Sequence, residues 1–130
     1  MLVTYNGVFY DHAALYISRG SGSGRGFLYD PAGTYASAHG GGLGGYIEDE
    51  YATILRFIEY HKNDSTEKVC KDTTLDEEKR LVELIIYRPS PGIATCAINL
   101  SDVLSTSPYF PNVKPGTFWP GNLFRDAKKQ

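Results

Sequence analysis

One stretch, residues 91–104, constrains the fold of this chain more than any other. It opens with a Pro-Gly pair, which interrupts regular structure, and changes within a few residues to the spacing of a helix. Thr95 is a suitable N-cap for a helix that begins at Cys96. The apolar side chains on the cysteine's side of that helix are Leu100, Val103 and Leu104. The sequence therefore predicts a short helix whose first residue directs its thiol toward the interior.

A cysteine at the start of a helix has two interpretations. The positive end of the helix macrodipole favours the thiolate, which is the nucleophilic form of the side chain. Alternatively, a free cysteine is often a small buried hydrophobic residue. The second cysteine, Cys70, lies on an expected short strand at 67–71, and we interpret it as a structural thiol. The sequence does not decide whether Cys70 and Cys96 form a disulfide, which would remove the nucleophile.

Length and charge narrow the class of protein. A chain of 130 residues predicts one domain, spanning 1–130, that can bury a core without disulfides. Its 15 acidic and 13 basic side chains include no basic cluster, which argues against a nucleic-acid partner. No apolar run is long enough for a transmembrane segment, and no Cys/His spacing predicts a metal site or a cofactor. Without the pattern of a signal peptide, we expect synthesis in the cytoplasm, with export to a target periplasm only through a dedicated secretion machine.

The N-terminal third predicts antiparallel strands. Asn6-Gly7 is a strong signal for a tight hairpin turn. The strand that follows places Ala13 and other apolar residues on one face and His12 on the opposite face. A later strand ends at Asp30, whose side chain can therefore reach a neighbouring strand. The expected strands are 2–5, 8–10, 11–18 and 27–30, with a polar Gly- and Ser-rich connector at 19–26.

The remaining segments predict helices, loops and an irregular tail. The Gly-rich segment 34–45 is expected to be a mobile loop beside any cleft. Thr74 and Glu77 form a capping box that opens a helix. The proline-rich tail, 108–123, is expected to lie extended across a surface. Between 48 and 61 an apolar stripe favours a helix, although a strand for its second half stays open; the stripe consists of Tyr51, Ile54, Leu55 and Ile58.

Cysteine catalysis requires a base that takes the thiol proton and a polar group that orients this base. His12 is the candidate base, and Asp30 is the candidate orienting group. The ordinary alternatives are an edge-strand histidine with its own partner and an aspartate that starts an Asp-Pro turn. His39, in the Gly-rich segment, competes as a base, whereas His61 is expected to be exposed surface.

The order of these motifs resembles a known family. HAALYI at 12–17, FLYDPAG at 27–33, a late Cys-Ala opening a helix and FWPGNL at 118–123 are similar to a circularly permuted NlpC-type papain-like cysteine peptidase. The resemblance implies an α+β papain-like fold, with an antiparallel sheet packed against a few helices. It also implies Cys96 as nucleophile, His12 as base and Asp30 as the polar third member. Relatives place Glu, Gln, Asn or His at this third site, so Asp30 matches the pattern by type.

The resemblance also implies a substrate. Bacterial relatives cleave amide bonds in peptidoglycan stem peptides, and some are antibacterial type VI secretion effectors matched by a cognate immunity protein. Two alternatives stay open: a lipid-directed acyl hydrolase or acyltransferase of the same fold, and a non-catalytic binding module. The candidate substrate-binding residues are Tyr10, Tyr16, His39 and Trp119.

Overall fold

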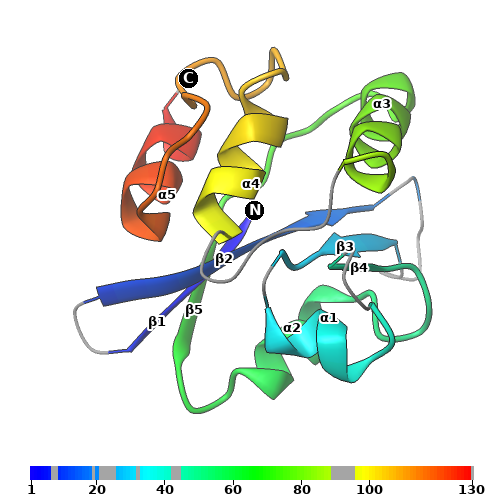
Figure 1. Ribbon diagram of the computed structural model, residues 1–130, viewed down its shortest axis with the longest axis vertical. Coiled ribbons are helices and arrows are strands. Elements are labelled where there is room, and N and C mark those ends of the chain that lie inside the picture. Colours follow the sequence, from blue (N-terminus) through cyan, green and yellow to red (C-terminus); the bar gives the residue numbers. More distant parts are fainter. Residues whose placement is uncertain are drawn as a thin grey trace.

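The computed structural model describes residues 1–6, 9–18, 20, 26–31, 33–41, 45–88 and 96–129, with the backbone alone for strand residues 2–6 and 9–11. The fold is mixed α+β, with a small antiparallel sheet between helices (Figure 1). This confirms the predicted class of fold and the predicted antiparallel sheet. In the described part of the chain, no helix is long and apolar enough to cross a membrane.

The sheet is built around one long central strand. Its described strands are β1 (Leu2–Asn6), β2 (Phe9–Ile17), β3 (Phe27–Tyr29), β4 (Tyr46–Ile47) and β5 (Ser65–Lys68). They are ordered β4-β3-β2-β1-β5, and every neighbouring pair is antiparallel. In the predicted hairpin β1 pairs with β2, with Thr4 opposite His12, while the turn residue Gly7 lies outside the described residues. Leu15 of β2 stands opposite Tyr29 of β3, so the two strands of the candidate site are neighbours.

Two strand boundaries differ from the prediction. The segments 8–10 and 11–18, predicted separately, form the single strand β2. The strand expected at 67–71 is β5, which lies earlier and ends at Lys68, so Cys70 is not on a strand. Strand β5 pairs with β1, and this pairing sets where β5 begins and ends. The spacing of residues within 67–71 does not indicate which strand this segment pairs with.

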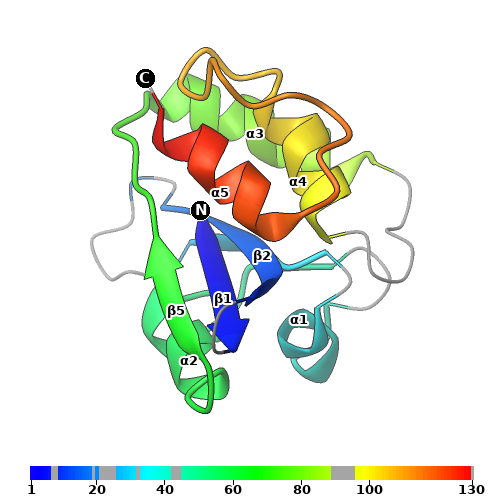
Figure 2. The ribbon, with the colours of Figure 1, turned by 90° about the vertical axis from the view of Figure 1, so that its left-hand side faces the viewer.

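Helices cover both faces of this sheet. They are α1 (Thr34–Ala38), α2 (Ile54–Tyr60), α3 (Leu75–Ile86), α4 (Cys96–Leu104) and α5 (Pro120–Lys128). Figures 1 and 2 show α3, α4 and α5 together on one side and α1 and α2 on the other. Because both faces are covered, β2 buries side chains in both directions.

Two apolar clusters follow from this layering. Ala13, on the face of β2 that was predicted to be apolar, packs in the larger cluster with α3, α4 and α5. Ala14, the next residue, packs in the smaller cluster with α1 and α2. The alternation along β2 therefore links the two layers. Large side chains of the larger cluster include Leu15, Ile17, Phe27, Tyr29, Leu81, Leu100, Leu104, Leu123 and Phe124. The smaller cluster includes Leu28, Tyr35, Ile47 and Phe57.

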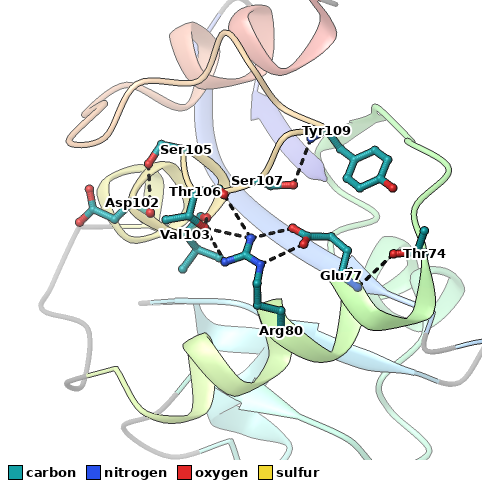
Figure 3. A network of polar contacts seen from close by, with 9 residues as sticks. All are labelled: Thr74, Glu77, Arg80, Asp102, Val103, Ser105, Thr106, Ser107 and Tyr109. Atoms are coloured by element: carbon teal, nitrogen blue, oxygen red, sulfur yellow. Dashed lines mark hydrogen bonds and ion pairs between the residues drawn. The ribbon is translucent and has the colours of Figure 1, made fainter.

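Helix α3 begins at the predicted cap. The Thr74 hydroxyl accepts a hydrogen bond from the Glu77 backbone N–H at 3.1 Å. The Glu77 carboxylate pairs with Arg80 through two bonds of 2.6 and 2.9 Å. Arg80 also donates to the hydroxyl and the carbonyl of Thr106, just beyond α4 (Figure 3). This network ties α3 to the end of α4.

The segment 34–45 is not the loop that the sequence predicted. It contains α1, in which Tyr35 and Ala36 are buried. Gly33, the N-cap residue, has no side chain to satisfy the free N–H groups of the first turn. The Asp30 carboxylate takes that role by accepting from the Ala36 N–H at 3.0 Å. Because the support of α1 comes from a carboxylate outside the helix, the sequence of α1 itself carries little sign that it is helical.

Two further predictions were wrong in part. In the segment 48–61 the helix begins only at Ile54, after the Thr53 cap, and its buried residue is Phe57. Leu55, placed in the predicted apolar stripe, is 80% exposed. The tail ends in a helix, α5, instead of running extended, because its apolar side chains are at helical spacing and can cover the sheet. The buried residues of α5 are Pro120, Leu123, Phe124 and Ala127.

Candidate active site

Cys96 is the first residue of α4, as predicted, and only 8% of its surface is exposed. The predicted cap, Thr95, lies outside the described residues. Both cysteines are free thiols, with Cys70 exposed, so the fold does not contain the disulfide that the sequence left open. Helix α4 packs on β2, the strand that carries His12 (Figure 1). The predicted apolar face of α4 is buried at Leu100, Val103 and Leu104.

His12 contacts two functional groups at once. Its Nε2 forms a short hydrogen-bonded ion pair with Oδ1 of Asp30. Its side chain also hydrogen-bonds to Cys96. Because Nε2 is occupied by the carboxylate, Nδ1 is the ring nitrogen left for the sulfur. The imidazole, 15% exposed, therefore stands between a carboxylate and a thiol.

Asp30 is held firmly behind this imidazole. Its side chain is fully buried, and its second oxygen, Oδ2, accepts from the Ala36 N–H of α1. Its own backbone N–H donates to the Gly45 carbonyl at 2.6 Å. A Cβ built on Gly33 would collide with both carboxylate oxygens, so this position requires a glycine. Each oxygen of the carboxylate thus has a defined partner.

The three groups shift one another's protonation. Burial, the largest single influence, lowers the pKa of His12, but the hydrogen bonds and charges of Asp30 and Cys96 raise it overall to about 10. Burial likewise raises the pKa of the Cys96 thiol, yet His12 reverses this effect. His12 and the backbone N–H groups of Ala13 and Ala97 together bring the Cys96 pKa below its usual value. The two shifts favour a thiolate facing an imidazolium.

This arrangement can carry out nucleophilic chemistry. A thiolate is the reactive form of cysteine, and an imidazolium beside it can give its proton to a leaving group. The carboxylate behind the ring fixes the ring's orientation, which is the third requirement of such a site. The backbone N–H of Cys96 is suited to stabilise the oxyanion that forms after attack.

The other two histidines lie on the α1 and α2 side of the sheet. His39 stacks on Tyr51 with ring centroids 4.0 Å apart, whereas the ring that meets both Asp30 and Cys96 is that of His12. His61 was predicted to be exposed surface, and this was wrong. It is half-buried, and its ring centroid lies 6.1 Å from that of His12.

The sequence did carry a signal for the placement of His61. An aromatic residue, Phe57, stands four positions before it, and residues at this spacing share one face of a helix. Their ring centroids are 4.5 Å apart. Because Phe57 is fully buried, its neighbour on the same face is drawn toward the sheet.

The remaining predicted binding residues are spread over the molecule. The side chain of Tyr10 lies outside the described part of the structure. Tyr16 is half-buried and lines a cavity of about 220 Å³ together with residues of α3 and the segment after β5. Within the described part of the chain, the lining of this cavity does not include the three residues of the candidate site. Trp119 is 62% exposed at the N-cap of α5.

Among the residues that the structure describes, no three His, Cys, Asp or Glu side chains are grouped in a way that could hold a metal ion. In comparisons with known protein families, curated proteins and solved structures, none matches this chain.

Proposed function

We propose that this protein is a cysteine hydrolase with a circularly permuted, NlpC-type papain-like fold, and that it cleaves amide bonds in peptidoglycan stem peptides. The observation that supports the proposal is the imidazole of His12, which contacts the Asp30 carboxylate and the Cys96 thiol at the same time. A histidine with an ordinary structural role needs only one such partner. A nucleophilic site needs both.

The proposed reaction proceeds in two steps. In the first, the Cys96 thiolate attacks the amide carbonyl carbon, and the carbonyl oxygen becomes an oxyanion. The imidazolium of His12 protonates the amide nitrogen, the C–N bond breaks, and an amine leaves behind a thioester. In the second step, His12 takes a proton from water, which attacks the thioester and releases a carboxylic acid. The thiolate and the imidazolium are restored, while Asp30 orients the ring throughout.

The biological setting that we propose is that of an antibacterial effector. The relatives that motivate this proposal are carried to a target cell by a secretion machine, and a cognate immunity protein blocks their sites. For this chain, an immunity partner would have to cover the small part of Cys96 that is accessible, 8% of the residue's surface.

The test compares purified protein with isolated peptidoglycan and with defined stem peptides, with new amines and cleaved fragments as the readout. We expect cleavage by the wild type and by Cys70→Ser, since Cys70 is exposed and plays no part in the site. We expect a loss of at least roughly a thousandfold in Cys96→Ala, the scale seen when a catalytic nucleophile is removed. Cleavage that survives Cys96→Ala would refute the mechanism. Fatty acid release from phospholipids, with peptides left intact, would instead favour the lipid-directed alternative.

A further inference from the structure

Two helices begin side by side at the candidate site. Figures 1 and 2 both show the first turn of α5 next to the first turn of α4. The packing agrees with this view in that α4 and α5 contact each other and both contribute residues to the larger buried cluster. Cys96 begins α4, and Trp119 is the N-cap residue of α5. The chain just before α5 therefore lies near the nucleophile.

An aromatic pair occupies this position and faces water. Phe118 and Trp119 are 52% and 62% exposed, although large aromatic side chains are usually covered. Their ring centroids are 4.8 Å apart and the rings are nearly perpendicular, at 83°. The pair forms an apolar corner that a ligand can cover. A flat apolar group placed there would gain the free energy of removing both rings from water.

The segment that carries this corner is basic, with Arg125 and Lys128 in the last turn of α5, at the other end of the helix from Trp119. The chain as a whole has more acidic than basic residues, but residues 105–130 contain four basic side chains and one acidic side chain. All four basic residues are exposed; they are Lys114, Arg125, Lys128 and Lys129. Asp126 pairs with Arg125 and Lys129 at 3.7 and 3.6 Å, which leaves a net positive surface on this segment. An anionic ligand that is long enough to run along α5 from the corner is therefore favoured.

We propose that the surface formed by Phe118, Trp119 and these basic residues binds the glycan of a polymer that carries anionic peptides, and so brings a stem peptide to Cys96. The inference rests on the proposed function and names how its polymeric substrate is held. Sugar rings have apolar C–H faces that stack on aromatic rings, and the free carboxylates of the peptides complement the basic residues. A lipid surface normally requires a larger apolar face than two rings provide.

Binding can be measured without cleavage, in the Cys96→Ala protein. The probe is isolated, insoluble peptidoglycan, and the readout is the fraction of protein that sediments with it. We expect Trp119→Ala and Phe118→Ala to weaken this binding about tenfold. Leu55→Ala is the matched control, because Leu55 is 80% exposed on α2, on the opposite side of the sheet, and it should bind like its parent. Unchanged thermal unfolding midpoints will show that the variants are folded.

A second readout uses the only tryptophan of the chain. Soluble disaccharide-peptide fragments should change the fluorescence of Trp119, and the change should weaken as salt screens the basic residues. Equal sedimentation of Trp119→Ala and its parent would overturn the proposal, as would tryptophan-dependent binding to anionic phospholipid vesicles but not to peptidoglycan. If tryptophan-dependent binding occurs while the wild type cleaves nothing, the surface is supported and the proposed hydrolysis fails.

Discussion

His12 is held from two sides, and its neighbours set its protonation against the effect of burial. Burial alone would lower the pKa of the ring and favour its neutral form, whereas the Asp30 carboxylate and the Cys96 sulfur favour the charged ring. The stabilisation is mutual, because the charged ring in turn favours the thiolate. At the scale of single residues, the site is therefore a coupled set in which moving one group changes the other two.

Gly33 gives a test of this coupling from a residue that carries no charge. In Gly33→Ala the new Cβ would collide with both oxygens of Asp30, so the carboxylate has to move. We expect the free energy of unfolding to fall by about 1–3 kcal/mol, the usual cost of disturbing a buried polar group. Cleavage should fall as well, because His12 loses its orienting partner. Chemical denaturation and cleavage rates measure the two effects.

The control for this substitution is Gly116→Ala. Nothing lies within 4 Å of a Cβ at Gly116, although its φ of +75° is strained for alanine. This variant should therefore lose stability through strain alone and keep the Asp30 position. If Gly33→Ala and Gly116→Ala affect cleavage equally, the close contact between Gly33 and Asp30 is not what matters.

The helices differ in how much of each the sequence reveals. Helix α3 was predictable because its cap, Thr74, and its apolar residues are local. Helix α1 was not, because its N-terminal support comes from Asp30 and its burial from contacts of Tyr35 with other elements. Helix α5 did carry a signal, a proline at its first position, which is typical of a helix start. The other prolines of the tail obscured that signal.

The N-caps of α2 and α3 provide a prediction at the scale of elements. Thr53 and Thr74 both accept a backbone N–H three residues ahead, at 3.2 and 3.1 Å. Thr53→Ala and Thr74→Ala should each lower the free energy of unfolding, measured by chemical denaturation, by about 1 kcal/mol. Thr53→Ser and Thr74→Ser, which keep the hydroxyl, are the matched controls and should lose much less. Losses from alanine no larger than those from serine would show that these caps do not stabilise the helices.

At the scale of the whole molecule, the site depends on an arrangement that no local pattern contains. Motifs selected His12, Asp30 and Cys96, but their meeting requires β2 at the centre of the sheet, β3 beside it and α4 packed on it. These contacts join residues from opposite ends of the chain. The spacing of residues in the sequence indicates on which face of a strand or helix a side chain lies. It does not indicate which distant helix packs on that face. The spacing from Phe57 indicates the face that His61 shares, but not that this face lies against the sheet beside His12.

The pH dependence of the site follows from the two shifts. The thiolate forms above the pKa of Cys96, which lies below its usual value, and the imidazolium persists up to about pH 10, the pKa of His12. Between these limits both charged forms exist together. Replacing His12 with glutamine removes the charge that lowers the Cys96 pKa, and leaves the burial that raises it.

The most direct measurement is the rate of alkylation of Cys96 by iodoacetamide as a function of pH, in Cys70→Ser protein so that one thiol reacts. We predict an acid midpoint below about 8.5, the usual cysteine pKa. In His12→Gln the midpoint should rise, because the charge that lowers the Cys96 pKa is gone while the burial that raises it stays, and alkylation near pH 7 should slow. A midpoint at or above about 8.5 in the parent, or one that His12→Gln leaves unchanged, would contradict the thiolate–imidazolium pair.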